Sequence, residues 1–117
     1  MTRSSRDSRE RRASARKPVA WRGRFGVNGR PEWEWSECAV EDVSHSGARL
    51  TIGDARGVRV GDSIAIAVER LGDTSVGIRL HGSIRHVVTL GESVDVGVEL
   101  VFATPQERRI AETLFTR

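Results

Sequence analysis

The sequence predicts a mainly β protein: a six-stranded antiparallel β-barrel with one C-terminal α-helix and a flexible N-terminal arm. Three observations support this prediction. Apolar residues recur at every second position through most of the chain, which is the pattern of strands with one buried face. Short turns rich in Gly, Asn and Asp separate these runs, and a helix start follows the last of them. Closing the sheet into a barrel would remove its exposed edges.

The first 17 residues have almost nothing to bury, since apart from Met1 only Ala13 and Ala15 are apolar. We therefore expect residues 1–17 to form a flexible, Arg-rich arm and residues 18–117 to form the barrel with its helix. Charge is divided in the same way. Residues 1–30 hold ten cations against two acids, a net charge of +8, whereas residues 31–117 have a net charge of −5. The surplus positive charge lies at the N-terminal end.

Six runs of alternating apolar residues follow the arm. Asn28-Gly29 favours a tight hairpin after the first run, and further turns are expected at residues 61–62, 71–73 and 90–92. Trp33 and Trp35 open the second run and are interpreted as anchors of the barrel core or rim, with a contact for a partner protein as the alternative. The alternating residues of the runs are, in order, Val19, Trp21 and Phe25; Trp33, Trp35, Cys38 and Val40; Ala48, Leu50 and Ile52; Ile64, Ile66 and Val68; Val76, Ile78, Leu80, Ile84 and Val88; and Val94, Val96, Val98, Leu100 and Phe102.

The segment Thr104-Pro105-Gln106-Glu107 predicts the start of a single helix over about residues 104–116. Thr is a favoured N-cap, Pro is favoured at the first helical position, and a Glu three residues after the cap completes a capping box. An apolar stripe would pack this helix on the barrel or plug an open end. Its members are Ile110, Ala111, Leu114 and Phe115.

Composition argues against several classes of protein. The longest apolar run, residues 64–68, is far shorter than the ~20 residues that span a bilayer, and residues 1–30 lack the apolar segment of a signal peptide, so we expect a soluble, cytoplasmic protein. The single cysteine, Cys38, forms neither an intramolecular disulfide nor a CxxC zinc site. We expect no metal and no cofactor.

The sequence contains no recognisable catalytic motif. Ser44 and His45 are adjacent, and neighbours in an extended segment point to opposite sides, so they do not form a nucleophile and base pair. His81 and His86 fall in the long fifth run and are expected on the surface or at a seam. We therefore expect a binding protein and not an enzyme.

Two local motifs remain. Arg12 and Arg16 form Arg-x-x-x-Arg just before the first run, and Asp42, Ser44 and Gly47 form Asp-x-Ser-x-x-Gly between the second and third runs. Taken alone, the second motif is compatible with a simple turn, in which Asp and Ser bond nearby backbone and Gly takes a positive φ.

In this order, and on the predicted barrel, the two motifs resemble the PilZ domain family of bacterial cyclic di-GMP receptors. The resemblance extends from about Glu10 to Phe115. It includes Glu10-Arg11-Arg12 with Arg16, the Asp42 to Gly47 motif followed by Ala48-Arg49-Leu50, the Gly61-Asp62 turn, the segment Val96-Gly97-Val98-Glu99-Leu100, and the helix start at Pro105-Gln106-Glu107-Arg108-Arg109. Ser46 departs from the family pattern, which often has a Gly there, and the first hairpin is somewhat long.

The resemblance implies that cyclic di-GMP is the ligand and that the binding residues are Arg11, Arg12, Arg16, Asp42, Ser44 and Gly47. Cyclic di-GMP is a dianion with two guanines, and guanidinium groups bind phosphates, guanine edges and purine faces. Asp42 would accept from the guanine N1–H and N2–H edge or hold an Arg, Ser44 would offer a hydroxyl, and Gly47 would allow close approach of backbone. Arg11 precedes the Arg motif, where such proteins are thought to select one ligand or an intercalated pair, and an Arg there favours the pair.

The mechanism that follows is coupled ordering: the ligand recruits the arm to the barrel, and the new surface is recognised by an unidentified partner protein, as in the control of motility or exopolysaccharide production. Two alternatives stay open. One is a PilZ-like interaction module that acts without ligand through Trp33, Trp35 or the helix. The other is a small barrel that binds nucleic acid through the basic arm, against which the acidic body and the lack of an evident row of exposed aromatic residues both argue.

Overall fold

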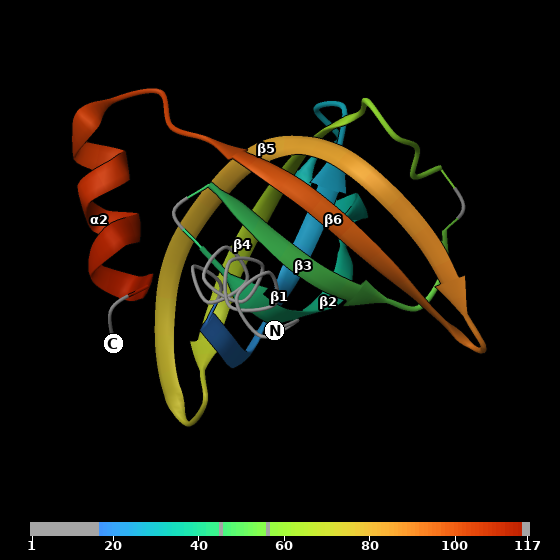
Figure 1. The fold of residues 1–117 in the computed structure, drawn as a ribbon, viewed down its shortest axis with the longest axis horizontal. Helices are drawn as coiled ribbons and strands as arrows, with labels where there is room; N and C mark the ends of the chain where they lie inside the picture. The colour runs from blue at the N-terminus through green and yellow to red at the C-terminus, as the bar shows by residue number, and fades with distance from the viewer. Residues whose placement is uncertain (1–16, 45, 56, 116–117) are drawn as a thin grey trace, which may run out of the picture.

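Six antiparallel strands close into a barrel in the computed structural model, and one helix lies beside it (Figure 1). The structure describes residues 17–44, 46–55 and 57–115. The ring order is β1-β2-β3-β6-β5-β4, and β4 pairs with β1 to complete it. The elements are β1 (Lys17–Val27), the 3-10 turn η1 (Glu32–Glu34), β2 (Ser36–Val43), β3 (Gly47–Ile52), β4 (Ser63–Leu71), β5 (Thr74–Leu90), β6 (Ser93–Val101) and α2 (Pro105–Phe115). The predicted six-stranded antiparallel barrel with a C-terminal helix is confirmed, while the predicted arm lies outside the described residues except for Lys17, which begins β1.

The barrel interior is filled by the alternating apolar residues that the sequence indicated. Ala48, Leu50 and Ile52 of β3 are buried while Arg49 between them is exposed, as period-two alternation requires. The largest fully buried side chains come from five of the six strands: Leu50, Ile66, Ile84, Val40, Val43, Val68 and Val96. These β-branched and aliphatic side chains fit a pleated, enclosed surface.

Strand β5 is long enough to pair with two neighbours, and Figure 1 shows it arching across the barrel. It pairs with β4 from Thr74 to Ser83 and with β6 from His81 to Leu90. The pairing with β6 shifts between Ile84 and His86, so the strand contains an irregularity of the bulge type. One extra residue in a strand moves every later side chain to the other face.

This irregularity corrects one prediction about the core. Simple alternation placed Val88 inside, but Val88 is 46% exposed, and Val87 packs against the core instead. Leu80 and Ile84, which precede the shift, are buried as predicted. His81 and His86 are exposed on the same strand, which agrees with the expectation of surface positions.

The first hairpin differs from the prediction in its connection. Asn28 and Gly29 have φ of 54° and 75° and form the expected turn. The chain then makes the additional turn η1, and β2 begins at Ser36, not at Trp33. Trp33 is 80% exposed, so its interpretation as a core anchor is wrong.

Helix α2 begins where the capping signals predicted. The Glu107 amide donates to Thr104 Oγ1 at 3.1 Å, and Glu107 Oε1 accepts from the Ala103 amide at 3.2 Å. Ala111 is buried against the barrel core, whereas Ile110 is half exposed over the first part of β5. The helix therefore covers one side of β5, and the side chains of residues 114 and 115 lie outside the description.

Candidate ligand-binding site

The link between β2 and β3 is built around the hydroxyl of Ser44, which is 5% exposed. Its Oγ accepts from the Gly47 amide at 3.0 Å and from the Ser46 amide at 3.3 Å. The Ser44 amide donates in turn to the Gly47 carbonyl at 2.8 Å. A buried amide without an acceptor costs about 1–3 kcal/mol, so this hydroxyl stabilises the turn. The local side-chain to backbone bonds expected of Asp-x-Ser-x-x-Gly are present at Ser44.

Gly47 is required by a close approach and not by an unusual backbone angle. It is absent from the positive-φ residues of the described chain, so it does not have the conformation that a simple turn would give it. A Cβ atom at this position would lie 3.0 Å from the Val98 carbonyl oxygen on β6. The neighbouring Ser46 carbonyl accepts from the Leu100 amide at 2.9 Å, which fixes the turn against the same strand. These contacts fix the turn between β2 and β3 against β6.

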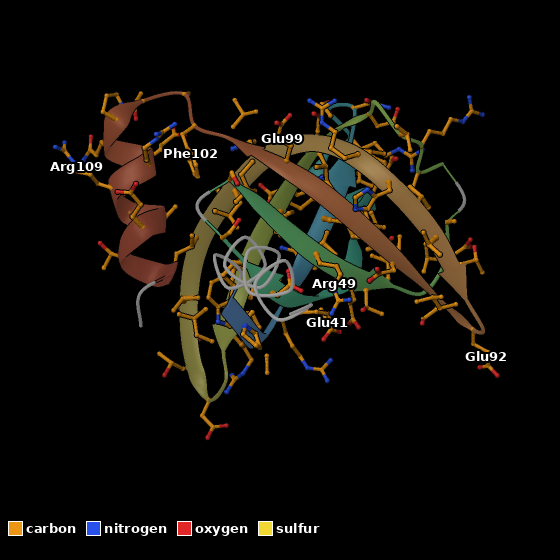
Figure 2. The ribbon with its side chains drawn as sticks, in the orientation of Figure 1. Glu41, Arg49, Glu92, Glu99, Phe102 and Arg109 are labelled. Atoms are coloured by element: carbon orange, nitrogen blue, oxygen red, sulfur yellow. The ribbon has the colours of Figure 1, made fainter. Side chains whose placement is uncertain are left out.

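Asp42 lies on the outer side of β2 within an ion-pair cluster. Its Oδ2 is 3.1 Å from Arg49 Nε, and the same nitrogen is 3.8 Å from Asp95 Oδ1. Figure 2 labels Arg49 on β3, between the strands that carry the two acids. The Asp42 side chain is only 16% exposed while that of Arg49 is 45% exposed. Within the described residues, Arg49 therefore lies between two carboxylates.

Sequence reasoning did not identify Arg49 and Asp95 as part of this site. Both occupy outward positions of alternating strands, which is a signal that the sequence contains. The sequence does not contain the register of the strands. In that register Arg49 lies opposite Asp42 on β2, and Thr51, two residues further along β3, lies opposite Asp95 on β6. Pairing of distant strands determines which outward residues meet.

Strand β1 starts beside this cluster. Lys17 pairs with Val43 and Pro18 pairs with Asp42, so the chain enters the barrel next to the Asp-x-Ser-x-x-Gly turn. Arg11, Arg12 and Arg16, the arginines predicted to bind ligand, lie outside the described residues. The structure thus describes Asp42, Ser44 and Gly47 of the predicted set and brings these three together.

Comparison with family models matches the PilZ domain over residues 10–116, which is nearly the whole chain. The chain belongs to the PilZ domain family. Both motifs singled out in the sequence fall inside the matched range. PilZ domains are binding modules for cyclic di-GMP, so at the level of the family this domain is a cyclic di-GMP-type adaptor.

A solved structure supports the fold of this PilZ domain. The Bacillus subtilis inhibitor of motility, MotI/DgrA, matches with a TM-score of 0.62 and 14% sequence identity. The match covers 87% of this chain and 50% of that one, so the PilZ domain spans about half the length of the inhibitor. No curated protein matches the chain in the corresponding search.

A concave region, separate from the Asp42 to Gly47 turn, lies on the PilZ barrel where β2 and β3 separate. The groove has a volume of ≈ 730 Å³, and buried Phe25, Cys38 and Ile52 form its apolar floor. Burial raises the pKa of the Cys38 thiol to about 12, with the nearby Glu69 carboxylate as a smaller cause. Cys38 is therefore a protonated core residue and no nucleophile.

Neither a metal-binding cluster nor a membrane-spanning helix is found among the described residues. Residues 17–44, 46–55 and 57–115 contain no cluster of three or more His, Cys, Asp or Glu that is placed to hold a metal ion. No helix within the same residues has the length and apolarity needed to cross a bilayer.

Proposed function

We propose that this PilZ domain binds cyclic di-GMP between its N-terminal arginines and the β2–β3 turn, and that it acts as a cytoplasmic adaptor without catalytic activity. One observation supports this above all others: Lys17 pairs with Val43, beside the Asp-x-Ser-x-x-Gly turn. Arg16 is the residue before Lys17, and consecutive Cα atoms are about 3.8 Å apart. The Arg-x-x-x-Arg motif therefore ends in the sequence one residue before the point where β1 begins beside the second motif.

The charges explain why the arm is needed. The barrel side of the site presents the carboxylates of Asp42 and Asp95 beside Arg49, and carboxylates repel a dianion. Arg12 and Arg16 supply the missing positive charge, and their guanidinium groups bind phosphates and guanine edges in bidentate fashion. The acidic side of the site attracts the same arginines. The ligand and the acidic side chains of the barrel together neutralise the positive charge of the arm, so ligand binding orders the arm.

The barrel residues have distinct roles in this proposal. Asp42 accepts from the guanine N1–H and N2–H edge or holds one of the incoming arginines. Ser44 acts through the turn that its hydroxyl stabilises, and Gly47 permits the close approach of backbone that this turn requires. The ordered arm and the exposed part of the ligand then form a surface that a partner protein recognises.

Calorimetric titration of the purified protein with cyclic di-GMP tests the proposal. We expect saturable binding at micromolar ligand, and Arg12→Ala and Arg16→Ala are each expected to abolish or greatly weaken it. Arg6→Ala is the matched control, because it removes one charge from the same arm outside the motif. Equal losses in all three variants would indicate unspecific attraction, and no binding at tens of micromolar ligand would refute the proposal.

The same titration reports stoichiometry. Arg11 adds a third guanidinium beside the motif, and guanidinium groups stack on purine faces. We expect two ligands per chain as an intercalated pair, and one ligand per chain in Arg11→Ala. One ligand per chain in the wild type would contradict the role given to Arg11.

The exposure of Trp33 favours a second candidate function, a protein-interaction module that needs no ligand. Buried aromatic anchors dominate the energetics of many interfaces. A partner that is retained unchanged by Arg12→Ala, and lost with Trp33→Ala, would support this alternative over the adaptor.

A further inference from the structure

The most exposed large apolar side chain of the described residues is held on a rigid support. Trp33, 80% exposed, lies in η1, whose ends are fixed by bonds from the Glu34 amide to the Pro31 carbonyl at 2.9 Å and from the Trp35 amide to the Glu32 carbonyl at 3.0 Å. A turn fixed in this way loses little entropy when it binds.

Side chains reinforce the same turn. Trp35 Nε1 donates to the Arg30 carbonyl at 2.8 Å, and the Trp35 ring lies so close to Gly26 that a Cβ atom there would overlap it. Arg79 lies over the Trp35 ring and pairs with Glu32 at 2.5 Å. The hydrogen bond from Arg79, together with its positive charge, lowers the pKa of the Glu32 carboxyl. All of these contacts hold the support, and none of them covers Trp33.

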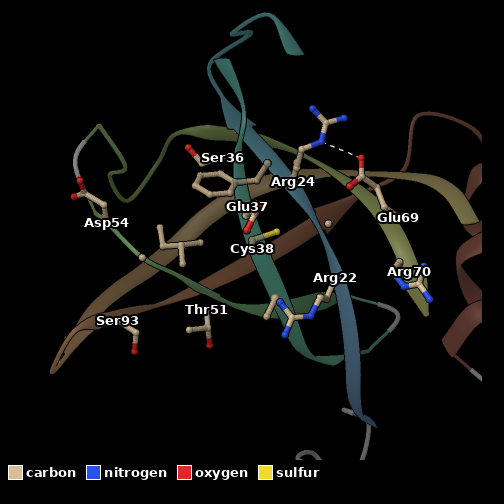
Figure 3. A pocket seen from close by; sticks show the side chains of 15 residues that line it. Arg22, Arg24, Ser36, Glu37, Cys38, Thr51, Asp54, Glu69, Arg70 and Ser93 are labelled. Carbon is tan, nitrogen blue, oxygen red and sulfur yellow. Dashed lines mark hydrogen bonds and ion pairs between the residues drawn. The ribbon is translucent and has the colours of Figure 1, made fainter. Parts of the chain in front are cut away.

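The groove between β2 and β3 is close to this turn along the chain. β2 residues Ser36 to Cys38 pair with β1 on one side, whereas the pairing with β3 begins only at Ala39. The strands separate there, and the apolar floor of the groove lies in the gap. Figure 3 shows Cys38 near its centre, with Arg22 and Arg70 on neighbouring strands at one side.

Positive charge at that side is unbalanced. Arg24 is paired with Glu69 at 2.9 Å and lies opposite Glu37, but Arg22 lies opposite Arg70 and Ala39. Like charges directly opposite one another across a sheet are destabilising. Among the described residues Arg22 has no acidic partner, and Glu34 beside Trp33 has no cationic one.

We propose that this chain forms a symmetric dimer in which the Trp33 turn of each copy inserts into the β2–β3 groove of the other, with Glu34 against Arg22. One chain presents both the exposed apolar side chain and a groove with an apolar floor and a cationic side. Two copies can therefore exchange them reciprocally, as an isologous interface requires. The ligand-binding turn lies at the other end of β1 and β2, so the dimer forms independently of the proposed ligand.

Sedimentation velocity from micromolar to several hundred micromolar protein measures this association. We expect a concentration-dependent dimer in the wild type, weakened about thirtyfold or more by Trp33→Ala, as for a central aromatic anchor. Val101→Ala is the matched control, because Val101 is another exposed apolar side chain, 56% exposed, at the opposite end of β6 from the groove-lining Ser93, and it should leave the association unchanged.

A charge exchange tests the pairing of residues. Glu34→Arg and Arg22→Glu are each expected to weaken the dimer, and the double variant is expected to restore it, because the ion pair is then reversed. A wild type that stays monomeric at several hundred micromolar, or an unchanged dimer in Trp33→Ala, would overturn the proposal. A double variant weaker than both single variants would show that Glu34 and Arg22 do not meet.

Discussion

Asp42 is the residue whose environment bears most directly on the proposed function. Its carboxylate is mostly shielded from solvent and is 3.1 Å from Arg49, a half-exposed guanidinium on the next strand. Arg49 also lies 3.8 Å from Asp95. Ion pairs with one partner half exposed to solvent, as Arg49 is, contribute about 0–1 kcal/mol to folding, so the cluster serves to orient Asp42 more than to stabilise the barrel.

Replacing Asp42 by Asn should therefore separate binding from stability. The amide keeps the shape of the side chain but has one acceptor oxygen and no charge, so a bidentate guanine contact is lost. We expect cyclic di-GMP binding to weaken by about 1–3 kcal/mol, with a small change in the free energy of unfolding. Calorimetry and urea unfolding measure the two quantities. Unchanged affinity in Asp42→Asn would remove Asp42 from the ligand contacts.

For single residues, the sequence identified members of the candidate site but not the neighbours that they contact in the fold. Ser44 and Gly47 could be found because their turn is local, and a short motif contains all the atoms that form it. Arg49 and Asp95 could not be assigned to the site, because their meeting depends on the register of three strands. Gly47 lacks the left-handed angle of a simple turn, because the constraint there is steric contact with β6.

Among the elements, β5 shows most clearly what an alternating pattern can and cannot specify. The period of two predicted the strand and its inward residues as far as Ile84. The shift in pairing near His86 then turned Val87 inward and Val88 outward. Adjacent valines have the same propensity and hydrophobicity, so the sequence alone gives no reason to choose between them. The pairing of β5 with β6 determines which of the two valines is buried.

The two valines provide a direct test of that register. Val87→Ala removes two methyl groups packed against the core and is expected to lower the free energy of unfolding by about 1–2 kcal/mol. Val88→Ala is the matched control, expected within about 0.5 kcal/mol of the wild type because the side chain is exposed. Urea denaturation measures both, and a larger loss for Val88→Ala would show that the strand continues without the shift.

The first hairpin was predicted only in part. Asn28-Gly29 correctly indicated a turn, since Asn and Gly tolerate positive φ. The additional turn η1 was not predicted, because the side-chain contacts that reinforce it come from Arg79, which is distant in the chain, and from Trp35, which follows the turn. Local propensity is a weak guide where tertiary contacts determine the backbone.

The whole molecule places two surfaces at opposite ends of β1 and β2. One end has the Asp42 to Gly47 turn and the entry of the arm, and the other has Trp33 and the groove. The barrel between them is a closed sheet with a continuous aliphatic core. In the proposals made above, this separation would leave the surface for the second copy free when the ligand is bound. The sequence predicted the barrel, because its repeated alternation is a property of the entire chain.

Core stability should depend on pH in the alkaline range through Cys38. Its pKa is raised to about 12 in the folded protein, so the buried thiol favours folding below its ordinary pKa, and that contribution is lost as the pH rises toward 12. The chain has no Tyr and a single Lys, so few other groups titrate there. We expect the free energy of unfolding to fall between about pH 9 and 12, and to fall less in Cys38→Ala. Denaturant unfolding under reducing conditions measures it, and identical pH profiles would contradict the assignment.

In the proposed function, the N-terminal arginines and the β2–β3 turn form one site for cyclic di-GMP. Titration of isotope-labelled protein with the ligand, followed by NMR, tests it most directly. We expect the amide signals of Arg12, Arg16, Ser46 and Gly47 to shift together along one saturation curve. Shifts confined to the arm, or the absence of any shift in the turn at saturating ligand, would contradict it.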